Sequence, residues 1–278
     1  MSHLVSAAEL SELITSGTPV RVLDVRWRLG GPDGYPDYLE GHVSGAVYVD
    51  LQTELSRHGR PDEGRHPLPD TATVQDAARR WGLNDGDRVV VYDDYGGLAA
   101  ARAWWILRHG SIDVRVLDGG WPAWRASGAP VESGAVTAHP GSVTLTDITG
   151  DSLTIDEVAA YPASGVLLDV RAPERYRGET EPYDPVAGHI PGAINLPTKA
   201  HLAADGTALD GEAIRATLTA SGVDEVTPVA AYCGSGITAA HTALMLAEAG
   251  VDAKIFHGSW SQWSNTTGRP VATGPQPG

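Results

Sequence analysis

Short, largely apolar runs alternate along the chain with longer stretches of helical periodicity. Four of these runs, rich in β-branched residues, are Arg88–Tyr92, Val114–Leu117, Val166–Val170 and Lys254–Phe256. They predict buried strands, whereas Leu98–Arg108 and Ile237–Glu248 predict helices. Gly110 and Gly250 follow the two helices, at the position of a left-handed C-cap. Because strands that alternate with helices form parallel sheets covered on both faces, the pattern predicts an α/β fold.

The chain contains an internal repeat, in which four landmarks of the first half recur in the second half in the same order. The matching segments are Val22–Arg26 and Leu167–Arg171, Gly41–Ala46 and Gly188–Ala193, Val90–Asp93 and Ala230–Cys233, and Gly119–Trp121 and Gly258–Trp260. The spacing nearly agrees, since His42 follows Asp24 by 18 residues and His189 follows Asp169 by 20. A duplicated α/β domain accounts for this pattern, and ligands are expected at the carboxyl ends of its strands.

The repeat divides the 278 residues into two predicted domains, residues 1–131 and 151–278. Residues 132–150 between them are rich in Gly, Ser and Thr without sustained periodicity, which is typical of a linker. The main difference between the two copies is an insertion around Arg57–Asp70 in the first half. It is rich in Arg, His, Pro and Gly, so we predict a long surface loop.

Composition and charge exclude several classes of protein. The chain is 42% hydrophobic and 20% charged, which is ordinary for a globular protein with a real core. Its formal net charge of −15 repels nucleic acid and anionic membranes, so neither is expected as a partner. The sequence has no apolar run of about 18 residues, and Met1–Leu10 does not resemble a secretion signal. We expect a soluble, cytoplasmic protein.

The single cysteine, Cys233, lies where the chemistry is expected. One cysteine excludes an intrachain disulfide, a CxxC redox pair and a zinc site made of several thiolates. Val229–Tyr232 predicts a buried strand that leads directly into Cys233, and a helix is predicted from Ile237. Gly234 and Gly236 allow the intervening loop to point backbone N–H groups inward as an anion nest. Together with the helix dipole, this favours a thiolate over a buried structural cysteine.

Two other classes of cysteine enzyme fit the loop less well. A cysteine phosphatase has the same layout of strand, loop and helix, but it needs an arginine six residues after the cysteine to hold phosphate, and Ala239 stands there. The sequence also lacks the signature of a papain-like protease. In the first copy Asp93 replaces the cysteine, and a carboxylate cannot carry sulfur. We therefore expect the first domain to be catalytically silent.

These landmarks resemble the tandem-domain rhodanese-like sulfurtransferases over nearly the whole chain. The loop Cys233–Ala239 is similar to the CGSGVTA loop of the 3-mercaptopyruvate sulfurtransferase branch, with Ile237 in place of Val. The thiosulfate branch tends to carry basic side chains directly after the cysteine, whereas this chain has Gly234 and Ser235. The resemblance implies two rhodanese-like domains, each a parallel sheet with helices on both faces.

The resemblance also implies a two-step transfer of sulfur. The Cys233 thiolate would attack the sulfur of 3-mercaptopyruvate, pyruvate would leave, and a persulfide would remain on the cysteine. With no second cysteine in the chain, the acceptor would be a separate thiol, such as thioredoxin or a small thiol, or cyanide in vitro. We expect neither a metal nor an organic cofactor.

Several side chains are assigned roles by their positions in the family's motifs. Arg175 matches the arginine that pairs with the anionic substrate, and its planar fork suits a carboxylate. Ser235 is expected to be catalytic, by donating a hydrogen bond or proton to the substrate, and His42 to face the active-site cleft. The remaining loop residues expected to bind substrate are Gly234, Gly236, Ile237 and Thr238.

One departure from the family's pattern leaves alternatives open. The branch usually has a second arginine before the GHIPGA motif, but Tyr183–Ala187 contains none. Arg177 could replace it, or the donor could be thiosulfate with cyanide as acceptor. A different class of function is a persulfide carrier loaded by a partner protein. We also hypothesise that the insertion adds positive charge to the rim of the pocket through four side chains, which are Arg57, Arg60, Arg65 and His66.

Overall fold

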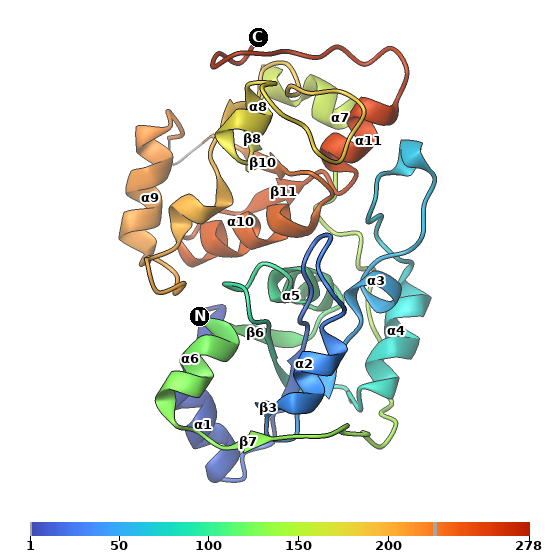
Figure 1. Ribbon diagram of the computed structural model, residues 1–278, viewed down its shortest axis with the longest axis vertical. Helices are drawn as coiled ribbons and strands as arrows, with labels where there is room; N and C mark the ends of the chain where they lie inside the picture. The colour runs from blue at the N-terminus through green and yellow to red at the C-terminus, as the bar shows by residue number, and fades with distance from the viewer. Residues whose placement is uncertain (1, 225–226) are drawn as a thin grey trace. The chain divides into compact units, whose positions relative to one another are not determined.

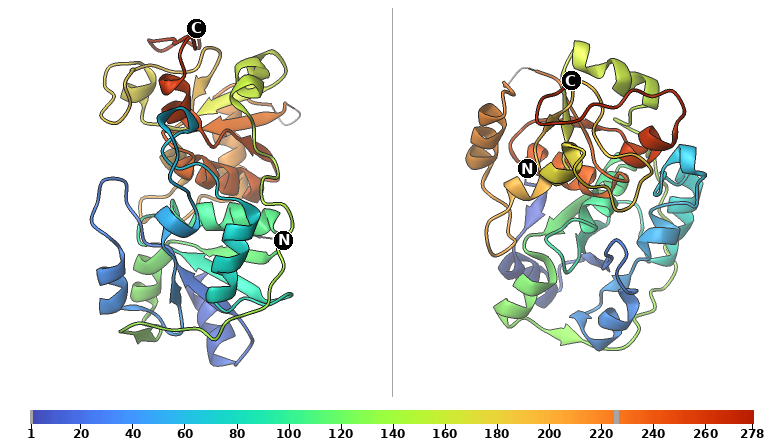
Figure 2. Two further views of the ribbon diagram at one scale, coloured as in Figure 1. Left: turned by 90° about the vertical axis from the view of Figure 1, so that its right-hand side faces the viewer. Right: turned by 45° about the horizontal axis from the view of Figure 1, so that its top comes forward.

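The computed structural model describes residues 2–224 and 227–278, which fold into two compact units (Figures 1 and 2). Neither unit is a continuous piece of the chain. The first comprises the residues up to Ser56, Leu68–Gly150 and Ala203–Ala208, whereas Arg57–Pro67 belongs to the second unit with Asp151–Leu202 and Leu209–Gly278. The insertion predicted as a surface loop of the first domain therefore contributes most of its length to the second unit.

The first unit is built on a five-stranded parallel sheet. The strand order is β1 (Leu4–Val5), β6 (Asp113–Leu117), β5 (Arg88–Tyr92), β2 (Arg21–Asp24) and β4 (Val47–Tyr48). A separate antiparallel pair joins β3 (His42–Val43) and β7 (Val131–Glu132). Successive residues of β5 point to opposite faces of the sheet, and both Val89 and Val90 are 1% exposed. Both faces are therefore covered, as a parallel sheet requires.

The helices of the first unit pack on the two faces of this sheet. They are α1 (Ala7–Thr15), α2 (Tyr35–Glu40), α3 (Leu51–Glu54), α4 (Thr71–Arg80), α5 (Ala100–His109) and α6 (Gly120–Ser127). Helix α5 packs against β5 and β6 (Figure 1). Leu10 of α1 and Trp124 of α6 are fully buried in one core cluster with Val22 and Val90 of the sheet.

The second unit repeats this plan with a four-stranded parallel sheet. Its order is β11 (Ala253–Ile255), β10 (Val229–Tyr232), β8 (Val166–Asp169) and β9 (Ile194–Asn195). A parallel bridge between Ser152 and Ile255 lies at the edge that β1 occupies in the first unit. The helices are α7 (Ile155–Ala160), α8 (Pro173–Tyr176), α9 (Gly211–Ala220), α10 (Ile237–Glu248) and α11 (Ser259–Asn265), with short 3-10 helices η1 (Pro61–Glu63), η2 (Tyr161–Ala163) and η3 (Thr198–His201).

The predicted α/β fold with parallel sheets is confirmed, but one capping prediction is wrong. Gly250 has the expected positive φ of 78°, whereas Gly110 has a φ of −70° and the left-handed residue is Ser111. The space beside Gly110 is narrow, because an added Cβ would lie 3.2 Å from Leu145 Cδ2. No helix among the described residues is long and apolar enough to cross a membrane.

The segment predicted as a linker packs on the first unit. Val143 and Ile148 are fully buried, and backbone hydrogen bonds join Gly141 N–H to Arg79 O and Val143 N–H to Leu83 O. Buried apolar side chains and paired backbone groups order this segment, although its sequence has no periodic pattern.

Candidate active site

The cysteine loop connects β10 to α10 at the carboxyl end of the second sheet. Cys233 is 2% exposed, and Gly236 donates its backbone N–H to Cys233 Sγ over 3.0 Å. Gly236 has a φ of +82°, and a Cβ there would lie 2.4 Å from His257 O, so the position requires glycine. The loop therefore brings a backbone donor and the N-terminus of α10 to the sulfur.

Ser259 completes the surroundings of the sulfur. Its Oγ accepts a hydrogen bond from Cys233 N–H at 3.1 Å, donates to Phe256 O at 2.9 Å and lies 3.9 Å from Cys233 Sγ. Ser259 has a φ of 53°, matching the 55° of its repeat counterpart Gly120. A left-handed conformation costs a serine roughly 1 to 2 kcal/mol. Ser259 is not among the residues predicted from the sequence, although the Gly-to-Ser difference between the two copies marks this position.

The first copy shows what the same loop does with a carboxylate. Asp93 is fully buried, and its two carboxylate oxygens accept four backbone hydrogen bonds. The donors, at 2.7 to 2.9 Å, are the N–H groups of Tyr95, Gly97, Ala99 and Ala100. The turn between strand and helix in the first unit is thus an anion nest, and the carboxylate of Asp93 occupies it. This contact also supports the expectation that the first copy carries no sulfur chemistry.

The insertion brings His66 to the cysteine loop. His66 Nδ1 and Ser235 Oγ are hydrogen-bonded at 2.8 Å, and their side chains are largely buried. In Figures 1 and 2 the light-blue segment that includes η1 lies beside α11, which agrees with the contacts between these two elements. Gly64 makes this close approach possible, because an added Cβ would lie 2.8 Å from Gly258 O. The pair can relay a proton to a group bound above the cysteine.

Hydrogen bonds through Ser261 of α11 fix the insertion to the cysteine loop. Ser261 N–H donates to Gly234 O at 2.9 Å, and its hydroxyl accepts from Arg65 N–H at 3.1 Å. One residue therefore holds both the backbone after Cys233 and the backbone before His66. The contact between Arg65 and Ser261 is not readable from local sequence, because 196 positions separate the two residues.

Arg175 lies in α8, beside the cysteine loop. Its Nε and Nη2 donate to the Glu181 carboxylate at 2.7 to 3.1 Å, and its side chain is 15% exposed. An added Cβ on Gly234 would lie 3.4 Å from Arg175 Nη1. The neighbouring carboxyl group of Asp184 pairs with Arg65. Burial raises the pKa of Asp184, and the Arg65 guanidinium offsets this rise only in part. Arg175 is thus held by Glu181 with one edge of its guanidinium toward the loop.

The other predicted site residues fall into two groups. Ile237 and Thr238 form the first turn of α10, with Ile237 3% exposed. His42 lies in the first unit, fully buried, with its ring stacked on Tyr38 and its Nδ1 hydrogen-bonded to Tyr38 O. His189 stacks on Tyr176 in the same way in the second copy. The His42 ring therefore braces a turn of the first unit, and its contact with substrate stays a prediction.

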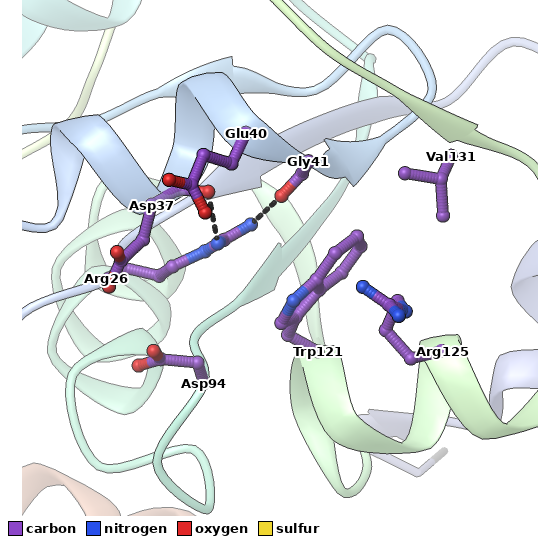
Figure 3. Close-up of a pocket in the computed structure, with 8 residues that line it drawn as sticks. All are labelled: Arg26, Asp37, Glu40, Gly41, Asp94, Trp121, Arg125 and Val131. Atoms are coloured by element: carbon purple, nitrogen blue, oxygen red, sulfur yellow. Dashed lines mark hydrogen bonds between the residues drawn. The ribbon is translucent and has the colours of Figure 1, made fainter.

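The first unit also contains a pocket of about 300 Å³ (Figure 3). Arg26 lines it and donates to Asp37 O and Gly41 O, and Trp121 lies beside its guanidinium. In the second copy the corresponding Trp260 is covered, since its Nε1 donates to Val186 O. The pocket lining contains none of the predicted site residues.

A family model for the rhodanese-like domain matches residues 6–127 and 154–266. The chain belongs to the rhodanese-like family. It is 49% identical over 275 residues to a Mycobacterium tuberculosis protein named "Putative thiosulfate sulfurtransferase SseB", covering 98% of this chain and 97% of that protein. It is 42% identical over 289 residues to a Pseudomonas aeruginosa protein named "Probable 3-mercaptopyruvate sulfurtransferase", covering 98% and 99%.

A solved structure gives the same assignment for this rhodanese-like chain. The crystal structure of SseA from Escherichia coli, a 3-mercaptopyruvate sulfotransferase with the rhodanese fold, matches with a TM-score of 0.83 and 30% identity. The match covers 94% of this chain and 99% of SseA. The predicted membership of the tandem-domain sulfurtransferases, in the 3-mercaptopyruvate branch, is confirmed, and the protein is a sulfurtransferase.

Proposed function

We propose that this sulfurtransferase moves sulfur from 3-mercaptopyruvate to an external thiol through a persulfide on Cys233. The observation that carries the proposal is the placing of three groups around one loop. The Gly236 N–H contacts Cys233 Sγ, the Ser235–His66 pair lies two residues along, and Arg175 faces Gly234. These groups supply a nucleophile, a proton relay and an anion-binding edge.

In the first step the Cys233 thiolate attacks the sulfur of 3-mercaptopyruvate. A sulfur–sulfur bond forms, the carbon–sulfur bond breaks, and its electron pair passes to the carbon and carbonyl oxygen of an enolate. One proton converts the enolate to pyruvate. The Ser235 hydroxyl, hydrogen-bonded to His66, is suited to deliver this proton, which His66 then replaces. The sulfur stays on Cys233 as a persulfide.

In the second step a thiolate of the acceptor attacks the outer sulfur of the persulfide. The Cys233 thiolate leaves with the electron pair of the sulfur–sulfur bond, so the enzyme returns to its starting state. The chain has one cysteine, and the acceptor is therefore a thiol of another molecule, such as thioredoxin or a small thiol. Backbone donation from Gly236 stabilises the leaving thiolate.

Thiosulfate is the second candidate donor, favoured by the name of the mycobacterial relative. Steady-state assays distinguish the two donors, with pyruvate release measured for one and sulfite release for the other. The proposal predicts a higher kcat/KM for 3-mercaptopyruvate, with both reactions absent in Cys233→Ser. A higher value for thiosulfate would reverse the donor assignment, and no turnover with either donor would favour a carrier loaded by a partner protein.

A further inference from the structure

A second arginine, Arg65, lies at the cysteine loop as Arg175 does. An added Cβ on Gly234 would lie 3.2 Å from Arg65 Nη2, as well as 3.4 Å from Arg175 Nη1. Both guanidinium groups also lie against the ring of Tyr183, with their Cζ atoms 5.5 Å and 5.4 Å from its centroid. Two guanidinium groups therefore meet at the backbone of the residue that follows Cys233.

Arg65 has hydrogen-bond donors that the protein does not use. Its Nη1 pairs with the Asp184 carboxylate, but its Nε and Nη2 are buried and have no hydrogen-bond partner in the described part of the chain. A buried, charged N–H group without an acceptor is costly, and native proteins rarely leave one. An anionic ligand at Gly234 would satisfy Arg65 Nη2 and could reach Arg175 Nη1 as well.

The surrounding carboxylates hold the two arginines without filling the site. Glu181 takes Nε and Nη2 of Arg175, and Asp184 takes Nη1 of Arg65. These two acids offset the two positive charges, so the attraction for a ligand comes from donors aimed at one point rather than from an excess of charge. Fixed, planar donors of this kind favour an anion with two oxygens.

We propose that Arg65 is the second arginine of the donor site, and that it binds the anionic group of the sulfur donor together with Arg175. This inference rests on the function proposed above and assigns its substrate-binding contact to the insertion of the first half. It explains how the donor site can have two arginines although the segment Tyr183–Ala187 contains none. Tyr183 instead offers an aromatic surface on which both guanidinium groups pack.

Alkylation of the single cysteine tests this contact without any sulfur transfer. Iodoacetate carries a carboxylate and iodoacetamide is its neutral counterpart, so the ratio of their rate constants at Cys233 measures recognition of an anion at the loop. We expect Arg65→Gln to lower this ratio about 10-fold or more, as for the loss of one charge-assisted hydrogen bond. Arg60→Gln is the matched control, because it removes the same charge from the same segment at a side chain that is 74% exposed.

The iodoacetamide rate is the internal standard for the loop. A general disturbance of the loop changes both alkylation rates and leaves their ratio near that of the wild type, whereas loss of an anion contact changes the ratio. A ratio in Arg65→Gln equal to those of the wild type and Arg60→Gln would overturn the inference. Because no donor is used, this result is separate from any failure of the proposed sulfur transfer.

Discussion

His66 Nδ1 lies 2.8 Å from Ser235 Oγ, although the two residues are 169 positions apart in the sequence. The contact joins the insertion of the first repeat to the cysteine loop of the second. It gives the serine a proton-exchanging partner, without which a hydroxyl is a poor acid. The insertion is therefore part of the candidate active site. This gives a chemical reason for its presence in one copy of the repeat.

The first prediction concerns this pair. Ser235→Ala and His66→Asn should each slow pyruvate release from 3-mercaptopyruvate about 100-fold, because the enolate loses its proton source. The double variant should be no slower than the slower single variant, since the two residues act as one unit. Single-turnover pyruvate formation measures this effect. Loading from thiosulfate should change much less, because sulfite leaves without a proton on carbon. Equal losses with both donors would contradict the proton-relay role.

The second prediction compares two glycines of the loop. Gly236→Ala should displace the loop, because it requires a positive φ and would bring a Cβ to 2.4 Å from His257 O. Gly234→Ala should spare the fold, since its Cβ would meet only the ends of two arginine side chains at 3.2 Å or more. We expect a lower melting temperature for the first variant and a higher KM for the second. A higher KM without any change in melting temperature in Gly236→Ala would contradict this account.

The third prediction concerns Asp93. Asp93→Asn should destabilise the first unit by about 2 to 4 kcal/mol, because an amide NH₂ would face backbone N–H groups that now donate to a carboxylate oxygen. Urea unfolding measures the loss. Sulfur loading of Cys233 under native conditions should remain, since the first copy is expected to be silent. Loss of loading in a folded Asp93→Asn protein would argue against that expectation.

The duplicated landmarks were sufficient to predict the parallel sheets and the cysteine loop. Strand and helix periodicity is local, so Ile237–Glu248 and Arg88–Tyr92 were predicted with the observed bounds. The roles of Arg65 and His66 could only be hypothesised, because they depend on a segment that leaves its own half of the chain. His42 was assigned to the site by motif, but its burial against Tyr38 is a property of packing.

The fourth prediction uses the buried histidine of η3. Burial lowers the pKa of His201 from 6.5 to about 4, and neither ring nitrogen has a hydrogen-bond partner among the described residues. The unfolded chain therefore binds a proton more readily, so the free energy of unfolding should fall as the pH drops from about 6.5 towards 4, by a few kcal/mol. Urea unfolding at pH 7.5 and pH 5 measures this change.

His201→Leu should show a smaller decrease in stability between these two pH values than the wild type. His139→Leu, at an exposed position, is the matched control and should keep the full decrease. If His201→Leu lost as much stability on acidification as the control, the buried neutral histidine would not be a source of the pH dependence.

The central claim, that Cys233 carries sulfur, is tested most directly by intact-protein mass spectrometry. The protein is incubated briefly with 3-mercaptopyruvate or thiosulfate in separate tubes, with Cys233→Ser as the control. The account predicts a gain of one sulfur atom with 3-mercaptopyruvate, reversed by a thiol acceptor and absent in Cys233→Ser. No added sulfur with either donor, or equal addition to the Cys233→Ser protein, would contradict it.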